Sequence, residues 1–347
     1  MEPVTHFLTG ACLSRAGFNR KTALATVTMT LAAEAADLDV IAYVKGSATG
    51  FIAHRGITHT FLGIPFVAAL VVGLLWLLDA LWQRRRRARK LPPAPERRWG
   101  WLYLFACIAG LSHILLDFTN NYGVRPFYPF WGTWYAWDIV FIIEPLILAA
   151  LFAALTLPWL FGLVGQEIGA RQRGPRGRGA AIAALLFIVG LWGVRDFEHR
   201  RALAAMNAVE FHGEAASRIA AFPYMVNPFQ WAGVAETSNA FLSMHVDSLR
   251  PEADPGNNAQ SYYKPEPNEA TTAARNTRLG HAYVEWARFP LVEAEHLSTA
   301  AGGDLVSFND VRFLYPEQRR RPLQAYVLLD SHHHAEWQGF ELPKGQR

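Results

Sequence analysis

Long apolar runs in the middle of the chain constrain its fold more than any other feature. A helix needs roughly 20 apolar residues to cross a hydrocarbon core of about 30 Å. Four segments approach this length: 59–82, 99–118, 137–164 and 179–195. Residues 197–347 instead have the composition of an ordinary polar domain. The sequence therefore predicts a membrane-embedded domain over residues 1–196 and a soluble domain over residues 197–347.

Basic residues gather in two short runs that flank the apolar segments, at 84–98 and 171–178. Because cytoplasmic loops of membrane proteins carry an excess of Lys and Arg, we expect both loops to be cytoplasmic. The loop between them, 119–136, has Arg125 as its single basic residue, so this loop and the polar domain should be extracytoplasmic. The net charge of +4 is thus a signal of topology, and we expect no nucleic-acid partner.

The first 58 residues contain two shorter apolar segments, 4–18 and 22–36. Each would be about 22 Å long as a helix, too short to span comfortably. With basic residues at their junction they could form a re-entrant hairpin that returns both ends to the outer side, since irregular backbone is tolerated at depth when it is buried in protein. The alternative is one spanning helix over 22–44 with a cytoplasmic N-terminus. The first residues lack the pattern of a cleaved signal peptide, so we expect none.

The polar domain shows mixed periodicity. Residues 200–221 predict an amphipathic helix, whereas 305–315, 323–329 and 335–342 alternate like half-buried strands. The Pro-, Asn- and Glu-rich stretch 251–275 predicts a long loop. The expected fold is therefore mainly α, a polytopic helical membrane bundle with about four spanning helices and an N-terminal re-entrant helical hairpin. A small α+β or β-rich extracytoplasmic domain follows it.

His113 and Asp117 give the strongest local chemical signal. They stand four residues apart, on one face of a predicted spanning helix near its outer end. Such a pair can chelate one metal ion. In a soluble helix we would favour a buried His satisfied by its own Asp, but ionisable groups inside a membrane span are costly and usually mark a functional site.

Further polar residues are placed near this pair by the predicted topology. His54 and His59 lie at the outer mouth of the first long segment, and at least one of them is expected to bind metal. Arg55 could hold a phosphate or carboxylate by its fork of donors. Asp37 and Asp39 follow on the same side, and carboxylates with neutral imidazoles form a ligand set that zinc accepts. The sequence does not choose between Asp37 and Asp39 as the ligand.

Three other features are less specific. His6 joins the set if the re-entrant hairpin is correct. Glu144, which precedes Pro145 inside a predicted span, is a further candidate ligand or a partner that orients a ligand. The triplet His332–His334 lies between predicted strands, in a domain where we find no matching carboxylate spacing, so we interpret it as a surface turn. The cysteines Cys12 and Cys107 both lie in the apolar half and offer no Cys-based zinc site.

These motifs together resemble the YdjM-like family of bacterial inner-membrane proteins, described as membrane-bound metal-dependent hydrolases. The resemblance covers about residues 1–165 and rests on the following residues: Thr5-His6, Gly10, Asp37-Leu38-Asp39, His54-Arg55-Gly56, Thr58-His59, His113, Asp117, Tyr122-Gly123-Val124, Pro129-Phe130 and Glu144-Pro145. An Asp-Pro is more usual in the family at the last position. The polar domain resembles the outer extension of some members through Pro223, Asn227-Pro228-Phe229 and Trp231.

The family is in turn distantly similar to zinc-dependent phospholipase C and to single-strand-specific zinc nucleases. This similarity implies His6, Asp37 or Asp39, His59, His113 and Asp117 as metal ligands. It also implies a multi-pass protein of the bacterial inner membrane that holds one or two divalent ions, with zinc the favoured metal.

The function that follows is hydrolysis of a phosphoester or other ester in a membrane lipid or amphiphile at the outer face. Zinc-activated water would be the nucleophile. Asp39 or Asp117 would steer this water or bridge ions, and Arg55 would stabilise developing negative charge. The alternatives are a metal-binding transporter and a non-catalytic assembly or sensing protein with a structural metal. The sequence does not indicate a protein partner.

Overall fold

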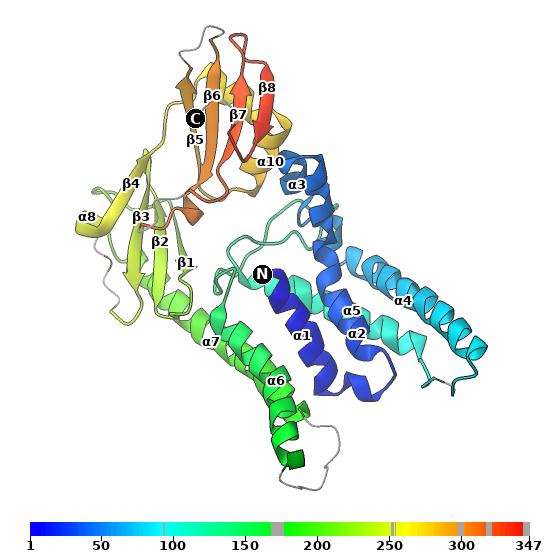
Figure 1. Ribbon diagram of the computed structural model, residues 1–347. Helices are drawn as coiled ribbons and strands as arrows, with labels where there is room; N and C mark the ends of the chain where they lie inside the picture. The colour runs from blue at the N-terminus through cyan, green and yellow to red at the C-terminus, as the bar shows by residue number, and fades with distance from the viewer. Residues whose placement is uncertain are drawn as a thin grey trace. The chain divides into compact units, whose positions relative to one another are not determined.

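The computed structural model describes residues 1–92, 94–167, 177–250, 253, 255–297, 302–316 and 321–342. The chain forms two compact units (Figure 1). We call the first the helical unit; it contains Met1–Asp39 and Arg55–Val194. The second, the sheet unit, contains Val40–His54 and Arg195–Arg347. The boundary predicted between residues 196 and 197 falls inside a continuous helix, α7 (Arg178–Asn207), whose residues belong to both units.

Three helices of the described chain are long and apolar enough to cross a membrane. They are α4 (Gly63–Ala88), α5 (Trp99–Thr119) and α7. Each contains most of a predicted segment. The fourth predicted segment, 137–164, differs: its helix α6 (Pro145–Glu167) starts eight residues later, at a proline, which is favoured at the first position of a helix.

The N-terminal segments form the predicted helical hairpin. Helix α1 (Pro3–Ala16) is joined through the 3₁₀ turn η1 (Phe18–Arg20) to α2 (Ala25–Glu34). The two helices touch at Gly10, where an added Cβ would lie 2.5 Å from the Met29 carbonyl oxygen. With 14 and 10 residues they are about 21 and 15 Å long, too short to cross a bilayer. The described chain shows no spanning helix over 22–44, because α2 ends at Glu34.

Two apolar clusters hold the helical unit together. One joins α2, α4 and α5, and the other joins α1, α6 and α7 with the C-terminal part of α5. The first cluster includes the buried side chains Met29, Val71, Leu102 and Phe105. The second includes Cys12, Leu116, Ile147, Leu151 and Ile188. Helix α5 contributes residues to both clusters and is therefore packed on two sides.

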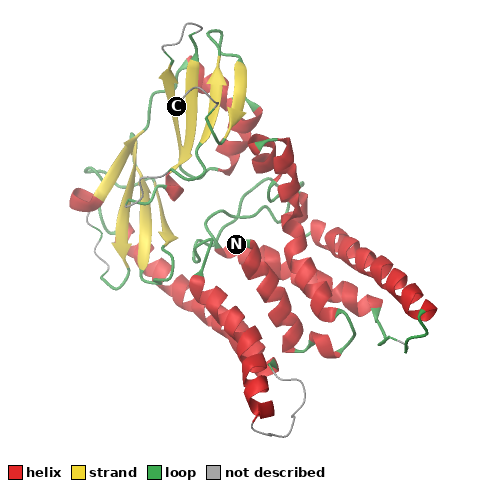
Figure 2. Ribbon diagram, viewed as in Figure 1, coloured by secondary structure: helices red, strands yellow, loops and turns green. Residues whose placement is uncertain are grey.

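The sheet unit contains two four-stranded antiparallel sheets, each with its strands in sequence order (Figure 2). The first sheet is β1 (Arg218–Pro223), β2 (Gln230–Glu236), β3 (Ala240–Asp247) and β4 (Ala259–Tyr263). The second is β5 (Pro290–His296), β6 (Asp304–Asp310), β7 (Ala325–Leu329) and β8 (Ala335–Gly339). Helices α9 (Glu269–Arg275) and α10 (Arg278–Trp286) connect the two sheets, whereas α8 (Pro255–Asn258) lies between β3 and β4 and the 3₁₀ turn η4 (Val311–Phe313) lies between β6 and β7. The β-rich prediction is confirmed.

Two predictions within this unit are wrong in part. No separate helix forms over 200–221. Helix α7 continues from the apolar run 179–195 to Asn207, and residues 218–223 form β1. The loop expected over 251–275 contains β4 and α9. Helix α9 begins at a reciprocal cap between Asn268 and Thr271, a local signal that composition alone conceals.

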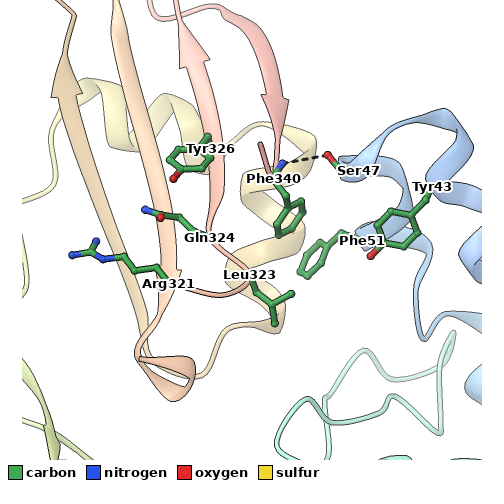
Figure 3. Close-up of a pocket in the computed structure, with 8 residues that line it drawn as sticks. All are labelled: Tyr43, Ser47, Phe51, Arg321, Leu323, Gln324, Tyr326 and Phe340. Atoms are coloured by element: carbon green, nitrogen blue, oxygen red, sulfur yellow. Dashed lines mark hydrogen bonds between the residues drawn. The ribbon is translucent and has the colours of Figure 1, made fainter. Parts of the chain in front are cut away.

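Residues 40–54 leave the helical unit and fold as part of the sheet unit. They comprise the end of the 3₁₀ helix η2 (Ala35–Lys45) and α3 (Ser47–Ala53). The Phe51 and Tyr283 rings are stacked, with their centroids 5.7 Å apart. The Ser47 hydroxyl accepts a hydrogen bond from Phe340 N at 3.2 Å. Tyr43 and Phe51 line a cavity of about 330 Å³ with residues of the second sheet (Figure 3). The segment is therefore an integral part of the sheet unit.

Candidate metal site

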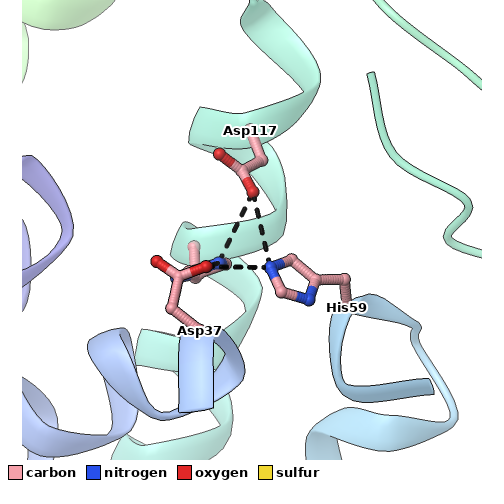
Figure 4. Close-up of side chains that lie close together, drawn as sticks. Asp37, His59 and Asp117 are labelled. Carbon is pink, nitrogen blue, oxygen red and sulfur yellow. Dashed lines mark hydrogen bonds and ion pairs between the residues drawn. The ribbon is translucent and has the colours of Figure 1, made fainter. Parts of the chain in front are cut away.

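Four ionisable side chains of the helical unit converge on one point. Figure 4 labels three of them, Asp37, His59 and Asp117. Each of Asp37, His59, His113 and Asp117 offers one possible ligand atom, and these atoms all lie within 4.8 Å of one another. Asp37 comes from η2, His59 ends the 3₁₀ turn η3 (Ile57–His59), and the other two come from α5. The three residues other than Asp37 are fully buried.

Helix α5 presents His113 and Asp117 on one face, as their spacing predicts. The His113 Nδ1 lies 2.7 Å from the carbonyl oxygen of Ala33. Because a carbonyl can only accept, Nδ1 must carry the hydrogen, and Nε2 of the neutral ring presents a lone pair. This Nε2 lies 3.5 Å from Asp117 Oδ2 and 3.7 Å from Asp37 Oδ1. The backbone of α2 thus fixes the tautomer that a metal ligand needs.

Asp39 orients the His59 ring by contacting its Nδ1, the nitrogen that faces away from the cluster. The ring Nδ1 lies 3.3 Å from Asp39 Oδ2 and 3.1 Å from the Thr58 hydroxyl. Asp39 Oδ2 also accepts a hydrogen bond from the Arg55 backbone N at 2.9 Å. On the other side of the ring, Nε2 lies 3.2 Å from Asp37 Oδ1. A carboxylate behind a His whose second nitrogen faces the cluster is the usual arrangement of a metal-ligating His. The structure therefore puts Asp37 in the cluster and Asp39 behind it.

The charges of the cluster favour a bound cation. Burial raises the pKa of Asp37, but the His59 hydrogen bond and the neighbouring His113 outweigh it and lower that pKa to about 2. Asp37 is therefore ionised at neutral pH. Among the described residues, His113 Nε2 and Asp117 Oδ2 are buried atoms without a hydrogen-bond partner, although they face each other. Buried acceptors left in this way are costly. Two imidazoles and two carboxylates fit a divalent ion such as zinc.

Arg55 contacts Asp117 Oδ1, whereas His59 and His113 face the other carboxylate oxygen, Oδ2. Its Nη2 donates to Asp117 Oδ1 at 2.8 Å, and its Nη1 donates to the Gly123 carbonyl at 2.6 Å. The guanidinium also lies over the Tyr122 ring, 4.6 Å from its centroid. Burial lowers the pKa of Arg55 to about 10, so the group remains charged at neutral pH. The predicted charge-stabilising role of Arg55 stays a prediction; its visible contacts hold Asp117 in place.

His6 lies beside the four-residue cluster. Its ring stacks on His113 with centroids 3.7 Å apart, and its Nε2 lies 3.4 Å from Asp117 Oδ1. The amino group of Met1 contacts the same carboxylate oxygen. Both ring nitrogens of His6 are buried and have no hydrogen-bond partner among the described residues. The hairpin α1–α2 thus brings His6 to the site, as the sequence analysis required for its inclusion.

Neither Glu144 nor His54 belongs to the four-residue cluster. Glu144 is fully buried, and its Oε1 lies 3.5 Å from the Leu146 N in the first turn of α6. It joins no group that could hold a metal in the part of the chain that the structure describes. His54 follows the last residue of α3 and belongs to the sheet unit. The roles of both residues as ligands stay predictions.

Sequence reasoning missed the Ala33 carbonyl and the Thr58 hydroxyl. A backbone carbonyl carries no side-chain signal, so nothing in the sequence identifies Ala33. Thr58 precedes His59 directly and contacts both Asp39, at 3.3 Å, and His59. Its position inside the motif could have suggested that it orients the ring.

Comparisons with known proteins agree with the membrane assignment. A family model described as YdjM inner membrane protein matches residues 1–202. The "Uncharacterized protein YfhP" of Bacillus subtilis (strain 168) is 25% identical over 170 residues, which are 47% of this chain and 47% of that protein. The chain therefore spans about half the length of this relative. No solved structure matches the chain.

Proposed function

The chain belongs to the YdjM inner membrane protein family, and from this premise we propose that it is a membrane-bound, metal-dependent hydrolase. The observation that carries the proposal is the buried cluster of Asp37, His59, His113 and Asp117. Two neutral imidazoles and two carboxylates on rigid elements are the ligand chemistry of hydrolytic zinc sites. One or two ions could be held, since His6 stands beside Asp117.

A divalent ion held there would act as a Lewis acid and make water a nucleophile near neutral pH. The residues of the chain would supply the rest. The Ala33 carbonyl and Asp39 fix the tautomers of His113 and His59. Arg55 holds Asp117 and keeps a positive charge at the edge of the site, where it could stabilise a developing anion. Of the two carboxylates predicted to steer the attacking water, we propose Asp117 for this role, because Asp39 contacts the His59 nitrogen that faces away from the cluster.

The substrate class follows from the position of the site along α5. His113 and Asp117 lie within the last two turns of this candidate membrane-crossing helix, about 9 Å or less from its end at Thr119. A site at this depth is close to the headgroup layer of a bilayer. We therefore propose an ester or phosphoester of a lipid or another amphiphile as the substrate. We propose that this end of α5 lies at the outer face, and the basic runs at 84–98 and 171–178 support that topology. Residues 168–176 lie outside the described part of the chain.

The core next to the cluster argues against a transporter. Apolar side chains fill the interface of α2, α4 and α5 in the described structure, among them Met29, Ala68, Val71, Leu75, Leu102, Phe105 and Ala109. A path for a hydrated ion would need polar groups or water along this interface. Hydrolysis at one end of the helices requires no such path.

The test is an assay of the detergent-purified protein against phospholipid and phosphodiester substrates. We expect turnover that a chelator abolishes and that zinc restores. An Asp117→Asn variant should lose this activity, whereas Tyr43→Phe, a change in the sheet unit, should retain it. A metal-loaded protein that turns over no member of either class, while Asp117→Asn still loses its metal, would favour a structural metal in an assembly or sensing protein.

A further inference from the structure

An apolar pocket of about 370 Å³ lies in the helical unit, next to the metal-site cluster. Its walls come from the residues that follow η3, from the C-terminal half of α5 and from the loop that connects α5 to α6. Among the described residues that line it, Tyr135 is the one with a polar side chain. The apolar lining includes Phe61, Leu111, Leu115, Phe118, Val124 and Phe127.

The pocket and the cluster share helix α5. Ile114, which lines the pocket, directly follows the cluster residue His113, and Phe118 directly follows Asp117. Successive residues of a helix lie about 100° apart around its axis. The pocket and the cluster therefore occupy neighbouring faces of α5 at the same level along the helix.

Backbone hydrogen bonds connect the pocket wall to the residues that support the cluster. Val124 and Tyr135 exchange two N–H···O hydrogen bonds of 2.8 Å each. The carbonyl of Gly123, one residue earlier, accepts a hydrogen bond from Arg55 Nη1 at 2.6 Å, and Arg55 Nη2 donates to Asp117. The position of this wall is therefore fixed relative to the cluster.

Aromatic rings surround the pocket on the side of the loop. The Phe127 ring packs edge-on against the rings of Phe61 and Tyr135, with centroids 5.4 and 5.7 Å apart. In the same loop, Phe130 is 73% exposed and Trp131 is 66% exposed. An exposed indole ring beyond the end of a membrane-crossing helix is typical of the headgroup layer. The pocket thus lies just inside that layer in the proposed topology.

The chemistry of the lining selects a hydrocarbon ligand. A charged or hydrogen-bonding group would lose its partners in this pocket at a cost in free energy, whereas apolar cavities stay dry and accept apolar ligands. Leu111 and Leu115 are 49% and 44% exposed on a candidate membrane-crossing helix. The pocket is therefore open to the hydrocarbon of the bilayer, where the available ligand is the alkyl chain of a lipid.

We propose that this pocket holds a hydrocarbon chain of the lipid substrate, so that the ester group of the same molecule lies at the neighbouring cluster. The inference rests on the proposed function and deepens it, because it adds a subsite that recognises the chain. Lipid tails are as apolar as the lining, so binding gains come from van der Waals packing in the pocket. Filling the pocket should therefore raise KM for a substrate with long chains.

The experiment compares Leu115→Trp with Leu104→Trp in the full-length, detergent-purified protein. An indole at Leu115 fills the pocket. Leu104 is 47% exposed and lies outside the pocket, about three helical turns before Leu115 and on the same face of α5. The control thus adds the same ring to the same hydrocarbon-facing side of the helix.

The two substrates share a phosphodiester group: one is a long-chain phospholipid, and the other is a soluble analogue without alkyl chains. We expect Leu115→Trp to lower the ratio of kcat/KM, long-chain over chain-free, at least about tenfold, mainly through KM. Leu104→Trp should keep the ratio of the wild type. An unchanged ratio in Leu115→Trp would overturn the proposal.

Photolabelling gives a second readout that does not need turnover. The probe is a phospholipid with a diazirine at the end of one acyl chain, and labelled peptides are identified by mass spectrometry. We expect labelled pocket residues in the wild type and in Leu104→Trp, and loss of this label in Leu115→Trp. Equal labelling of all three proteins would overturn the proposal, because the probe would then report only the lipid that surrounds the helices.

These readouts also separate the proposal from the proposed function. If the wild type turns over neither substrate, the proposed function fails, and the labelling decides on the chain site by itself. If both substrates are turned over and the ratio does not change in Leu115→Trp, the chain site fails and the hydrolase stands. If Leu115→Trp does not fold, Leu111→Trp serves the same comparison.

Discussion

A buried and an exposed group of His and Asp residues have opposite surroundings in this molecule. In the helical unit the side chains are buried, and backbone or second polar groups fix each of His59, His113 and Asp117. In the sheet unit the Asp304 carboxylate contacts His296, which is 74% exposed, and His333, which also lies 3.8 Å from Glu269. Burial makes a site rigid and makes each member costly to lose, because a buried charge without its partner is strongly unfavourable. Exposure permits adjustment and lowers that cost.

Asp117→Ala should produce the largest effect. It removes a proposed metal ligand and leaves the buried Arg55 guanidinium without its carboxylate. We expect a loss of about 3–5 kcal/mol in unfolding free energy. Denaturant or thermal unfolding in matched detergent checks this value. Asp304→Ala in the sheet unit is the comparison, and an equal loss there would refute the contrast between buried and exposed clusters.

Asp39→Asn should weaken metal binding without removing a ligand. The carboxylate sets the orientation of His59, and loss of such an outer partner typically lowers metal affinity about 10–100-fold. Zinc competition with a chromophoric chelator measures the change. Asp37→Asn should cause the larger loss of the two. The reverse order would make Asp39 the ligand and Asp37 the outer partner.

The pH dependence of metal-free protein should report on Asp37. Its pKa is lowered to about 2 from an ordinary value of 3.8, so its contribution to stability is present above about pH 4 and is lost as the pH falls toward 2. The contribution is about 2 kcal/mol by linkage. Thermal unfolding of wild type and Asp37→Asn between pH 2 and 5 tests it. Parallel curves over that range would contradict the assigned cause.

The smallest effect is expected from His332→Ala in metal-free protein. The side chain is exposed and supplies no ion pair among the described contacts, so the change in unfolding free energy should stay within about 0.5 kcal/mol. Chemical unfolding measures this change. A larger loss would show that the turn depends on the ring of His332.

The sequence predicted the cluster of the helical unit better than the contacts of Asp304 in the sheet unit, for a physical reason. His113 and Asp117 meet because a helix places residues i and i+4 on one face, a rule that depends on no other part of the chain. His59 and Asp37 were named through motifs, but the choice between Asp37 and Asp39 needed the turn η3. The meeting of Asp304 with His333 depends on the register of β6 with β7, which local pattern does not give.

The same contrast applies to the fold. Apolar length predicted α4, α5 and most of α7, and alternation predicted β6, β7 and β8. Composition did not reveal that residues 40–54 fold with the sheet unit, because Phe51 and Tyr43 find their aromatic partners far along the chain. It also did not reveal that α7 continues past the apolar run to Asn207.

The central claim is that the buried cluster of the helical unit holds a metal ion, and elemental analysis of purified protein tests it most directly. Wild type is compared with the double variant His113→Ala, Asp117→Ala at matched folding. We predict at least one equivalent of zinc or a similar divalent ion that is lost in the double variant. Equal metal content in wild type and the double variant would contradict the claim.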